Sequence, residues 1–163
     1  MARGRVKRSV VAGLSSASLG GLRAGTDTRD FLAQSTDSDN CLRLWGIRDS
    51  PRLRPTWSRL RSGDWIVFFE RGYLFAAAEV AATHESRDLA ARTWPDGGTF
   101  GLLIGFSRAV TLDAKASEYR SVLGARFMGF RRVNDEWQSA IRRKYGSAES
   151  FVLSELRNWQ RPS

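Results

Sequence analysis

The pattern of apolar and polar positions is clearest in the middle of the chain, where it predicts a β-hairpin. Residues 65–69 are β-branched and aromatic, in a run too short and too closely bounded by glycine for a helix. Arg71-Gly72 supplies the positive-φ position that a tight turn needs. Residues 73–80 form the second strand, where the alanines at 76–78 require close packing. We expect this hairpin to be the centre of a small, closed β-sheet.

Further strands and helices are predicted on both sides of the hairpin, which indicates an α+β protein. Segment 41–48 is an apolar segment that ends at a Trp-Gly pair and a following Pro51. Segment 100–110 is predicted as a strand, and segment 125–133 as a last strand or an extended loop. A short helix is expected at 31–34, and Pro55 favours a helical turn that runs to Leu60.

The C-terminal part of the chain predicts two helices. Asn134 is a suitable N-cap for residues 135–145, which begin with acids, end with bases and are followed by Gly146. Residues 147–159 repeat apolar side chains on one helical face. Trp137 and Trp159 lie on faces of these helices, and core packing is the favoured explanation for both.

The charge of the chain favours a nucleic-acid partner. The 163 residues carry a net charge of +9, and all but three of the basic side chains are arginines, the lysines being Lys7, Lys115 and Lys144. Arginine binds phosphate through two parallel hydrogen bonds and stacks on bases. A GC-rich genome would also favour arginine over lysine, but it would not explain the shortage of acids.

Several classes of function are disfavoured by composition. Cys41 is the only cysteine and His84, in a segment predicted as a polar loop, is the only histidine, so a zinc site cannot be assembled from them. We expect no metal and no cofactor. No apolar run is long enough to span a membrane, and the stretch 10–22 is too broken for a signal peptide. We therefore expect a cytoplasmic protein without a membrane partner.

Arginines alternate with tryptophans between positions 43 and 61. That arrangement suits a surface that holds phosphates and stacks a base. The arginines expected to contact the nucleic-acid backbone are Arg43, Arg48, Arg52, Arg54, Arg59 and Arg61, together with Arg131 and Arg132 nearer the C-terminus.

A set of short motifs resembles one family. The order Trp45-Gly46, the arginine-rich stretch, Gly63-Asp64 with the strand 65–69, the strand 73–80 and Trp94-Pro95-Asp96 is similar to the EVE and YTH-like branch of the PUA superfamily. The match covers residues 40–110, with Phe69 where the family has a tyrosine. This resemblance implies a small PUA-like β-barrel flanked by helices.

The same resemblance implies a function. Such domains bind a modified base, extruded from its strand, between aromatic walls, and several are the reading modules of modification-dependent (type IV) restriction endonucleases. It places Trp45 and Trp94 as walls of the pocket, with Asp96 and Asp49 as the nearest acids to accept a cytosine amino proton. Trp57 and Tyr73 are further aromatic candidates.

The expected function is therefore a non-enzymatic DNA-binding module. Its ligand would be double-stranded DNA carrying 5-methylcytosine, with a fused C-terminal nuclease domain as a further expected partner. The alternatives are a reader of N6-methyladenine in DNA or RNA, and an RNA-binding PUA-like domain. An enzyme is disfavoured because no HNH, Walker-type or clustered carboxylate site is present, and a protein-interaction or ribosome-associated domain would leave the loop tryptophans without a role.

The boundaries expected from the sequence divide the chain into three parts. Residues 1–24 are a basic segment, containing either a first strand at 5–14 or an arm along a phosphate backbone. Residues 25–160 are the PUA-like domain, and residues 161–163 begin a linker.

Overall fold

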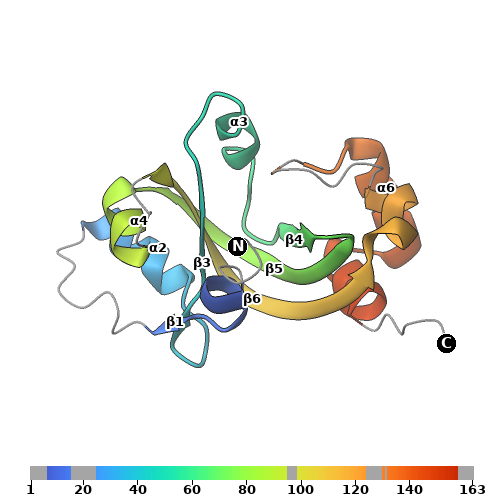
Figure 1. The fold of residues 1–163 in the computed structure, drawn as a ribbon, viewed down its shortest axis with the longest axis horizontal. Helices are drawn as coiled ribbons and strands as arrows, with labels where there is room; N and C mark the ends of the chain where they lie inside the picture. The colour runs from blue at the N-terminus through green and yellow to red at the C-terminus, as the bar shows by residue number, and fades with distance from the viewer. Residues whose placement is uncertain (1–6, 16–24, 95–98, 124–129, 131, 158–163) are drawn as a thin grey trace. The chain divides into compact units, whose positions relative to one another are not determined.

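The protein is a mixed α+β structure built on antiparallel strands (Figure 1). This computed structural model describes residues 7–15, 25–94, 99–123, 130 and 132–157. A two-stranded sheet joins β1 (Leu14–Ser15) to β2 (Cys41–Leu42). A four-stranded sheet has the order β3-β6-β5-β4, with bounds Leu44–Ile47, Leu102–Lys115, Tyr73–Glu85 and Trp65–Glu70.

Short helices connect and cover these strands. The first part of the chain has the π-helical turn η1 (Lys7–Val11) and the helices α2 (Thr26–Gln34), α3 (Arg54–Trp57) and α4 (Arg87–Thr93). After β6 come η4 (Ala116–Tyr119), α5 (Arg120–Leu123), α6 (Asp135–Tyr145), α7 (Ala148–Ser150) and η5 (Phe151–Leu156). Among the described residues, no helix combines the length and apolar character needed to cross a membrane.

The hairpin predicted from the apolar pattern is confirmed as β4 and β5. Its turn has Arg71 at φ 51° and Gly72 at φ 87°, the left-handed pair that a two-residue turn between twisted strands requires. The prediction that both strands of this hairpin lie at the centre of the sheet is wrong for β4. β4 lies at the edge, while β5 and β6 occupy the two inner positions.

The chain forms two compact units. Unit 1 comprises Met1–Asp64 and Ala78–Ala109, and unit 2 comprises Trp65–Ala77 and Val110–Ser163. Because the unit boundaries fall within β5 and β6, each of these strands contributes one part to each unit.

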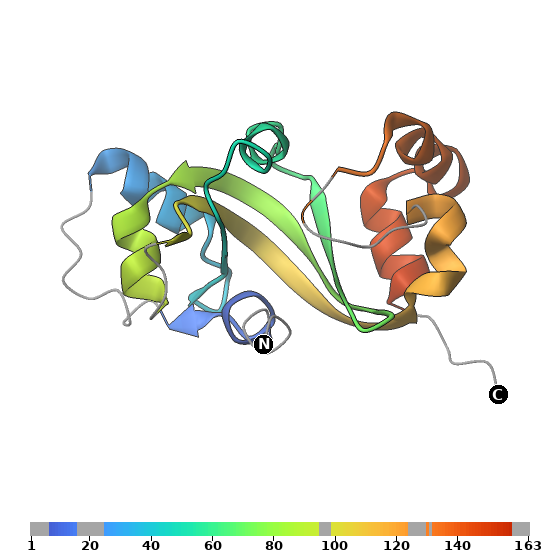
Figure 2. The ribbon, with the colours of Figure 1, turned by 45° about the horizontal axis from the view of Figure 1, so that its top comes forward.

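The core of unit 1 lies between the sheet and two helices. β3 pairs antiparallel with β6, so that Leu44 is opposite Gly105 and Gly46 is opposite Leu103. α2 and α4 lie together against this part of β5 and β6 (Figures 1 and 2). Their buried side chains meet those of the strands in one cluster, which contains Phe31, Leu42, Leu44, Leu89, Ala90, Trp94 and Leu103.

The core of unit 2 lies between strands and the C-terminal helices. Leu74 and Ala77 of β5 and Leu112 and Ala114 of β6 share a buried cluster with residues of η4, α5, α6 and η5. The predicted boundaries of α6 are confirmed. Asn134 accepts a hydrogen bond from the Trp137 amide at 2.8 Å, and Gly146 ends the helix at φ 80°.

Two other sequence predictions differ from the structure, and a third is not tested by it. Residues 7–11 of the predicted first strand form η1 instead, where Val10 is fully buried and η1 contacts β3. The polar loop predicted around His84 is wrong at its start, since β5 continues to Glu85. The predicted strand at 125–133 lies largely outside the described residues.

Candidate nucleic-acid interface

Trp45 projects from β3 on the face of the sheet opposite the unit 1 core. Its neighbour Gly46 faces that core, because a Cβ built on Gly46 would lie 2.9 Å from the ring of Trp94. Successive side chains of a strand alternate between faces, so Trp45 lies on the other side. Trp45 is partly buried, and its partner across the ladder is Ile104.

Trp57 of α3 contacts β6 at Leu103, the residue next to Ile104. Its indole Nε1 donates a hydrogen bond of 3.0 Å to the backbone carbonyl of Leu103, the residue before Ile104. Trp45 and Trp57 therefore meet the sheet at neighbouring residues, although the two tryptophans come from different elements. The hydrogen bond also fixes the orientation of the Trp57 ring.

The connection between β3 and β4, residues 48–64, is held to unit 1 by a second set of contacts. Arg54 forms two hydrogen bonds to the Asp49 carboxylate, of 3.0 and 2.7 Å, and two of 2.8 Å to Glu85 of β5. Such two-pronged pairs are geometrically specific. The hydrogen bonds that Arg54 donates hold the pKa of both carboxyls below the ordinary value, and the same bonds to Glu85 and Asp49 raise the pKa of Arg54.

The predicted backbone-binding arginines fall into distinct environments. Arg48, Arg52 and Arg59 are exposed, and no described residue pairs with any of them. Arg61 is exposed too, while its guanidinium donates to the carbonyls of Ser58 and Leu60. These four side chains are the part of the predicted set in unit 1 that is open to a phosphate.

Arg43 is occupied within the fold. Its guanidinium forms a 2.6 Å ion pair with Asp37 and donates to the carbonyls of Val10 and Val11, and only 13% of its side chain is exposed. Partial burial acts to raise the pKa of Asp37, but hydrogen bonds from the Cys41 amide and Arg43 outweigh it and leave that pKa lowered. Arg43 thus joins η1 to the β2–β3 region.

In unit 2, Arg132 is exposed, and its guanidinium lies 2.7 Å from the carboxylate of Asp135, the first residue of α6. Arg131 lies outside the described residues, as does Asp96.

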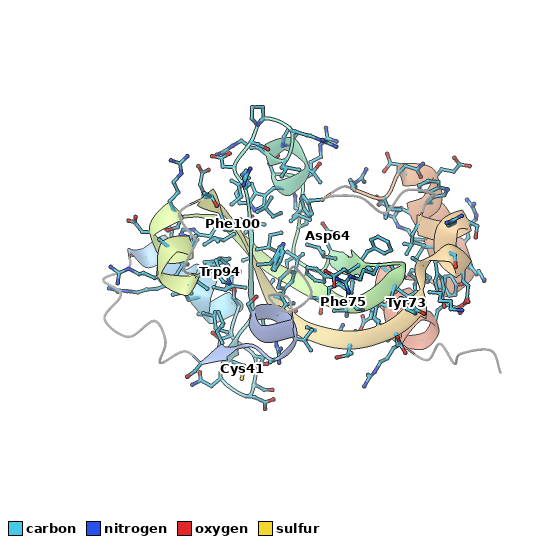
Figure 3. All side chains as sticks on the ribbon, in the orientation of Figure 1. Cys41, Asp64, Tyr73, Phe75, Trp94 and Phe100 are labelled. Atoms are coloured by element: carbon cyan, nitrogen blue, oxygen red, sulfur yellow. The ribbon has the colours of Figure 1, made fainter. Side chains whose placement is uncertain are left out.

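Trp94 is part of the hydrophobic core of unit 1. It is only 8% exposed, and its ring packs edge-on against Phe100 with 6.5 Å between centroids (Figure 3). Gly46 leaves the space that the ring fills, since a Cβ there would clash with both aromatic side chains. These contacts show that Trp94 packs in the hydrophobic core of unit 1. The predicted contact of Trp94 with a base stays a prediction.

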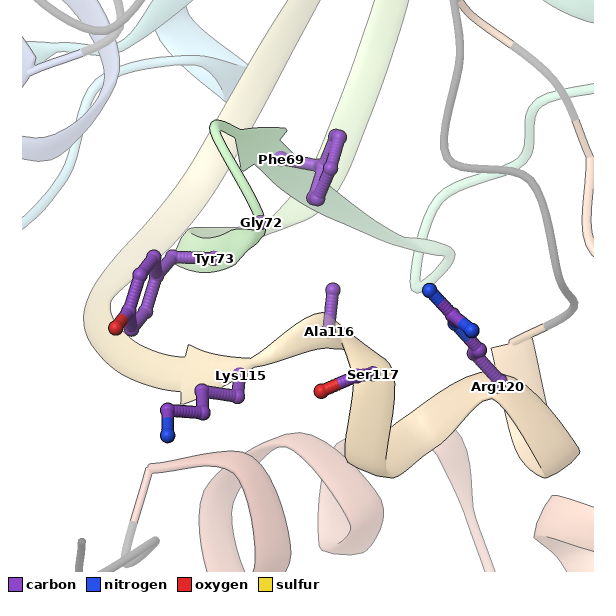
Figure 4. Close-up of a pocket in the computed structure, with 7 residues that line it drawn as sticks. All are labelled: Phe69, Gly72, Tyr73, Lys115, Ala116, Ser117 and Arg120. Atoms are coloured by element: carbon purple, nitrogen blue, oxygen red, sulfur yellow. The ribbon is translucent and has the colours of Figure 1, made fainter.

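Tyr73 belongs to unit 2, where it lines a pocket with Phe69, Lys115 and Arg120 (Figure 4). The structure thus brings Trp45, Trp57, Asp49 and Arg54 together in unit 1, and it gives Tyr73 a separate setting.

Sequence reasoning did not identify Glu85 or Leu103 as parts of this region. Glu85 lies in a polar stretch that resembles a loop, and its contact with Arg54 spans 31 positions of the chain. Leu103 takes part through its backbone carbonyl, which accepts the hydrogen bond from Trp57. Every residue has such a carbonyl, so the sequence does not mark this one. In the part of the chain that the structure describes, no three histidine, cysteine or carboxylate side chains gather closely enough to hold a metal ion.

Comparison with known proteins gives no family assignment. A scan of the sequence against protein-family models finds no match, and a search of curated proteins finds none of statistical significance. The similarity to EVE and YTH-like domains thus rests on the short motifs around Trp45, residues 63–69 and Trp94.

Proposed function

We propose that the protein is a DNA-binding module that recognises a modified base, 5-methylcytosine, flipped out of the duplex against Trp45 and Trp57. The observation that carries the proposal is the meeting of these two tryptophans at Leu103 and Ile104, beside the connection that bears Arg48, Arg52, Arg59 and Arg61. The family resemblance supports a PUA-like identity and a role as the targeting domain of a modification-dependent restriction endonuclease.

The chemistry of the two side chains suits such a ligand. A flipped base presents two π-faces, and the added methyl group of 5-methylcytosine gains apolar contact from an indole. Base–aromatic stacking contributes about 1–3 kcal/mol for each base. The hydrogen bond from Trp57 to Leu103 orients one ring before the ligand arrives, so less conformational entropy is lost on binding.

The surrounding charges suit the phosphates on either side of a flipped nucleotide. Exposed arginines that no described carboxylate neutralises can replace the counterions of DNA, which makes binding depend on salt. Arg54 supports them indirectly, because its pairs with Asp49 and Glu85 anchor the connection on which they are carried.

The test is a titration of the full chain at fixed, near-physiological salt. The duplexes are identical except for unmodified cytosine, 5-methylcytosine, 5-hydroxymethylcytosine or N6-methyladenine at one position, with a matched RNA alongside. We expect tighter binding to 5-methylcytosine than to cytosine. A preference for N6-methyladenine would replace the proposed base, and equal affinity for all ligands would leave a basic nucleic-acid-binding domain and overturn base recognition.

Single substitutions test whether the preference for the modified base depends on the tryptophans. Trp45→Ala is expected to lower discrimination about tenfold, which corresponds to the loss of one stacked base, and Trp45→Phe to retain most of it. Trp137→Ala is the matched control, because Trp137 is also partly buried but lies on α6 of unit 2. Retained discrimination in Trp45→Ala would show that the base binds elsewhere.

A further inference from the structure

Unit 2 contains a pocket of about 260 Å³ that the base-recognition proposal does not use (Figure 4). It lies between the β4–β5 turn and the segment that begins at the end of β6. Its lining consists of Phe69, Gly72, Tyr73, Lys115, Ala116, Ser117 and Arg120. The volume is slightly below the usual range for ligand pockets, about 300–1,000 Å³, so it suits one ring with a phosphate group rather than a large cofactor.

One side of the pocket is aromatic. Phe69 is 37% exposed and is the one large hydrophobic residue among the described residues with such exposure. Tyr73, across the turn from it, is partly buried. Figure 4 shows the ring of Phe69 standing beside the pocket opposite Ser117 and Arg120. A partly exposed aromatic ring can stack on a planar ring, and stacking of this kind tolerates any base.

The other side is cationic. Lys115, Ser117 and Arg120 are exposed, and no described carboxylate pairs with Lys115 or Arg120. None of the lining residues is acidic. A guanidinium, an ammonium and a hydroxyl are the donors that proteins use for phosphate oxygens.

The two sides are held together by the backbone. The amide of Ala116 donates a 2.9 Å hydrogen bond to the carbonyl of Gly72. This bond ties the hairpin turn to the end of β6, so the aromatic and the cationic residues are carried on one scaffold. Ala116 has a small side chain and Gly72 has none, so neither residue fills the pocket that both line.

We propose that this pocket binds one nucleotide, with its phosphate held by Arg120 and Ser117 and its base stacked on Phe69 (Figure 4). The ligand chemistry is a phosphate ester joined to a planar ring, and it can come from a free nucleotide or from a nucleotide of a single strand. The inference goes beyond the proposed function, because it requires neither a modified base nor Trp45 and Trp57.

The experiment uses isothermal titration of the full chain with three probes, namely AMP, an unmodified eight-nucleotide oligothymidylate, and inorganic phosphate. Binding of AMP would assign the free nucleotide as a ligand, and binding of the oligonucleotide alone would assign the strand; both support the site. Absence of binding to both would overturn it. Comparison of Phe69→Ala with Trp45→Ala separates this site from base recognition in unit 1, because a loss of binding in Trp45→Ala alone would place the ligand at unit 1 and overturn the pocket assignment.

Variants locate the ligand. Phe69→Ala is expected to weaken nucleotide binding about tenfold, the contribution of one stacked base, without changing the affinity for inorganic phosphate. Arg120→Gln is expected to weaken all three probes. Arg143→Gln is the control, because it removes the same charge from an exposed position on α6. Equal losses in Arg120→Gln and Arg143→Gln, or no loss in Phe69→Ala, would overturn the assignment.

Discussion

The side chain of Ser35 occupies the space that any side chain on Gly105 would need. A Cβ built on Gly105 would lie 1.7 Å from the Ser35 Oγ and 2.7 Å from its Cβ. Ser35 is fully buried, and its hydroxyl donates a 2.6 Å hydrogen bond to the Phe31 carbonyl at the end of α2. The bare backbone of β6 at Gly105 therefore allows α2 to approach the sheet closely.

We predict that Gly105→Ala destabilises the protein by about 1–3 kcal/mol, the usual cost of overpacking a core. Ser35 cannot move away easily, because its carbonyl also accepts a 2.9 Å hydrogen bond from the Arg43 amide. Urea denaturation followed by circular dichroism measures the change. Ser35→Gly in the same chain removes both clashing atoms and should recover part of the loss; an additive double variant would show that Ser35 is not the obstacle.

We predict that Trp57→Phe lowers the free energy of unfolding by about 1 kcal/mol, the net contribution of one hydrogen bond. The variant keeps an aromatic ring but removes the Nε1 donor to the Leu103 carbonyl. If this bond orients the ring for a base, discrimination between modified and unmodified duplexes should also fall. Trp137→Phe provides the comparison, and equal discrimination by wild type and Trp57→Phe would assign the bond to stability alone.

The arginines of the predicted backbone-binding set should separate into two classes. Arg52→Ala or Arg59→Ala should weaken binding to every duplex and reduce the slope of log K against log salt by about one for each phosphate that is no longer bound. Arg43→Ala should instead lower stability by roughly 3 kcal/mol, since it leaves the largely buried Asp37 carboxylate without its ion-pair partner. Affinity at four salt concentrations and urea denaturation distinguish the classes; unchanged stability in Arg43→Ala would contradict the internal role.

The elements that were predictable from sequence are those fixed by local chemistry. The β4–β5 hairpin follows from a short aromatic run and a glycine turn, and α6 follows from Asn134 and Gly146 at its ends. In each case the residues that determine the element lie within it or next to it, so no knowledge of the rest of the fold was needed.

The features that were not predictable depend on contacts between distant segments. β5 continues through the polar stretch to Glu85 because it has β6 to pair with, which overrides the local pattern. The same applies to the site, where Arg54 was expected to bind phosphate but lies against Glu85, and Trp94 was expected at a loop but enters a core made by α2, α4 and the sheet. The amino-acid composition showed that the protein is basic. Which arginines are exposed and which form ion pairs could be known only from the fold.

Stability is predicted to fall between pH 7 and pH 5.5 because of His84. Its ring packs on Phe31 with 5.1 Å between centroids, and its Nε2 is 3.0 Å from the Thr28 hydroxyl. Burial lowers the pKa of His84 below its ordinary value, against the opposing charge of Asp27. Below about pH 6.5 the unfolded chain therefore binds more protons at His84 than the folded protein does. The contribution of the neutral His84 to stability is fully present above that pH, and it is lost as the pH falls towards the pKa of the folded state. Urea denaturation at several pH values should show that the free energy of unfolding falls as the pH falls in the wild type. In His84→Gln the free energy of unfolding should stay constant over this range. The carboxyls with a lowered pKa, Asp37, Asp49 and Glu85, lose their contribution only at lower pH, so an identical decline in both proteins over this range would assign the effect to another group.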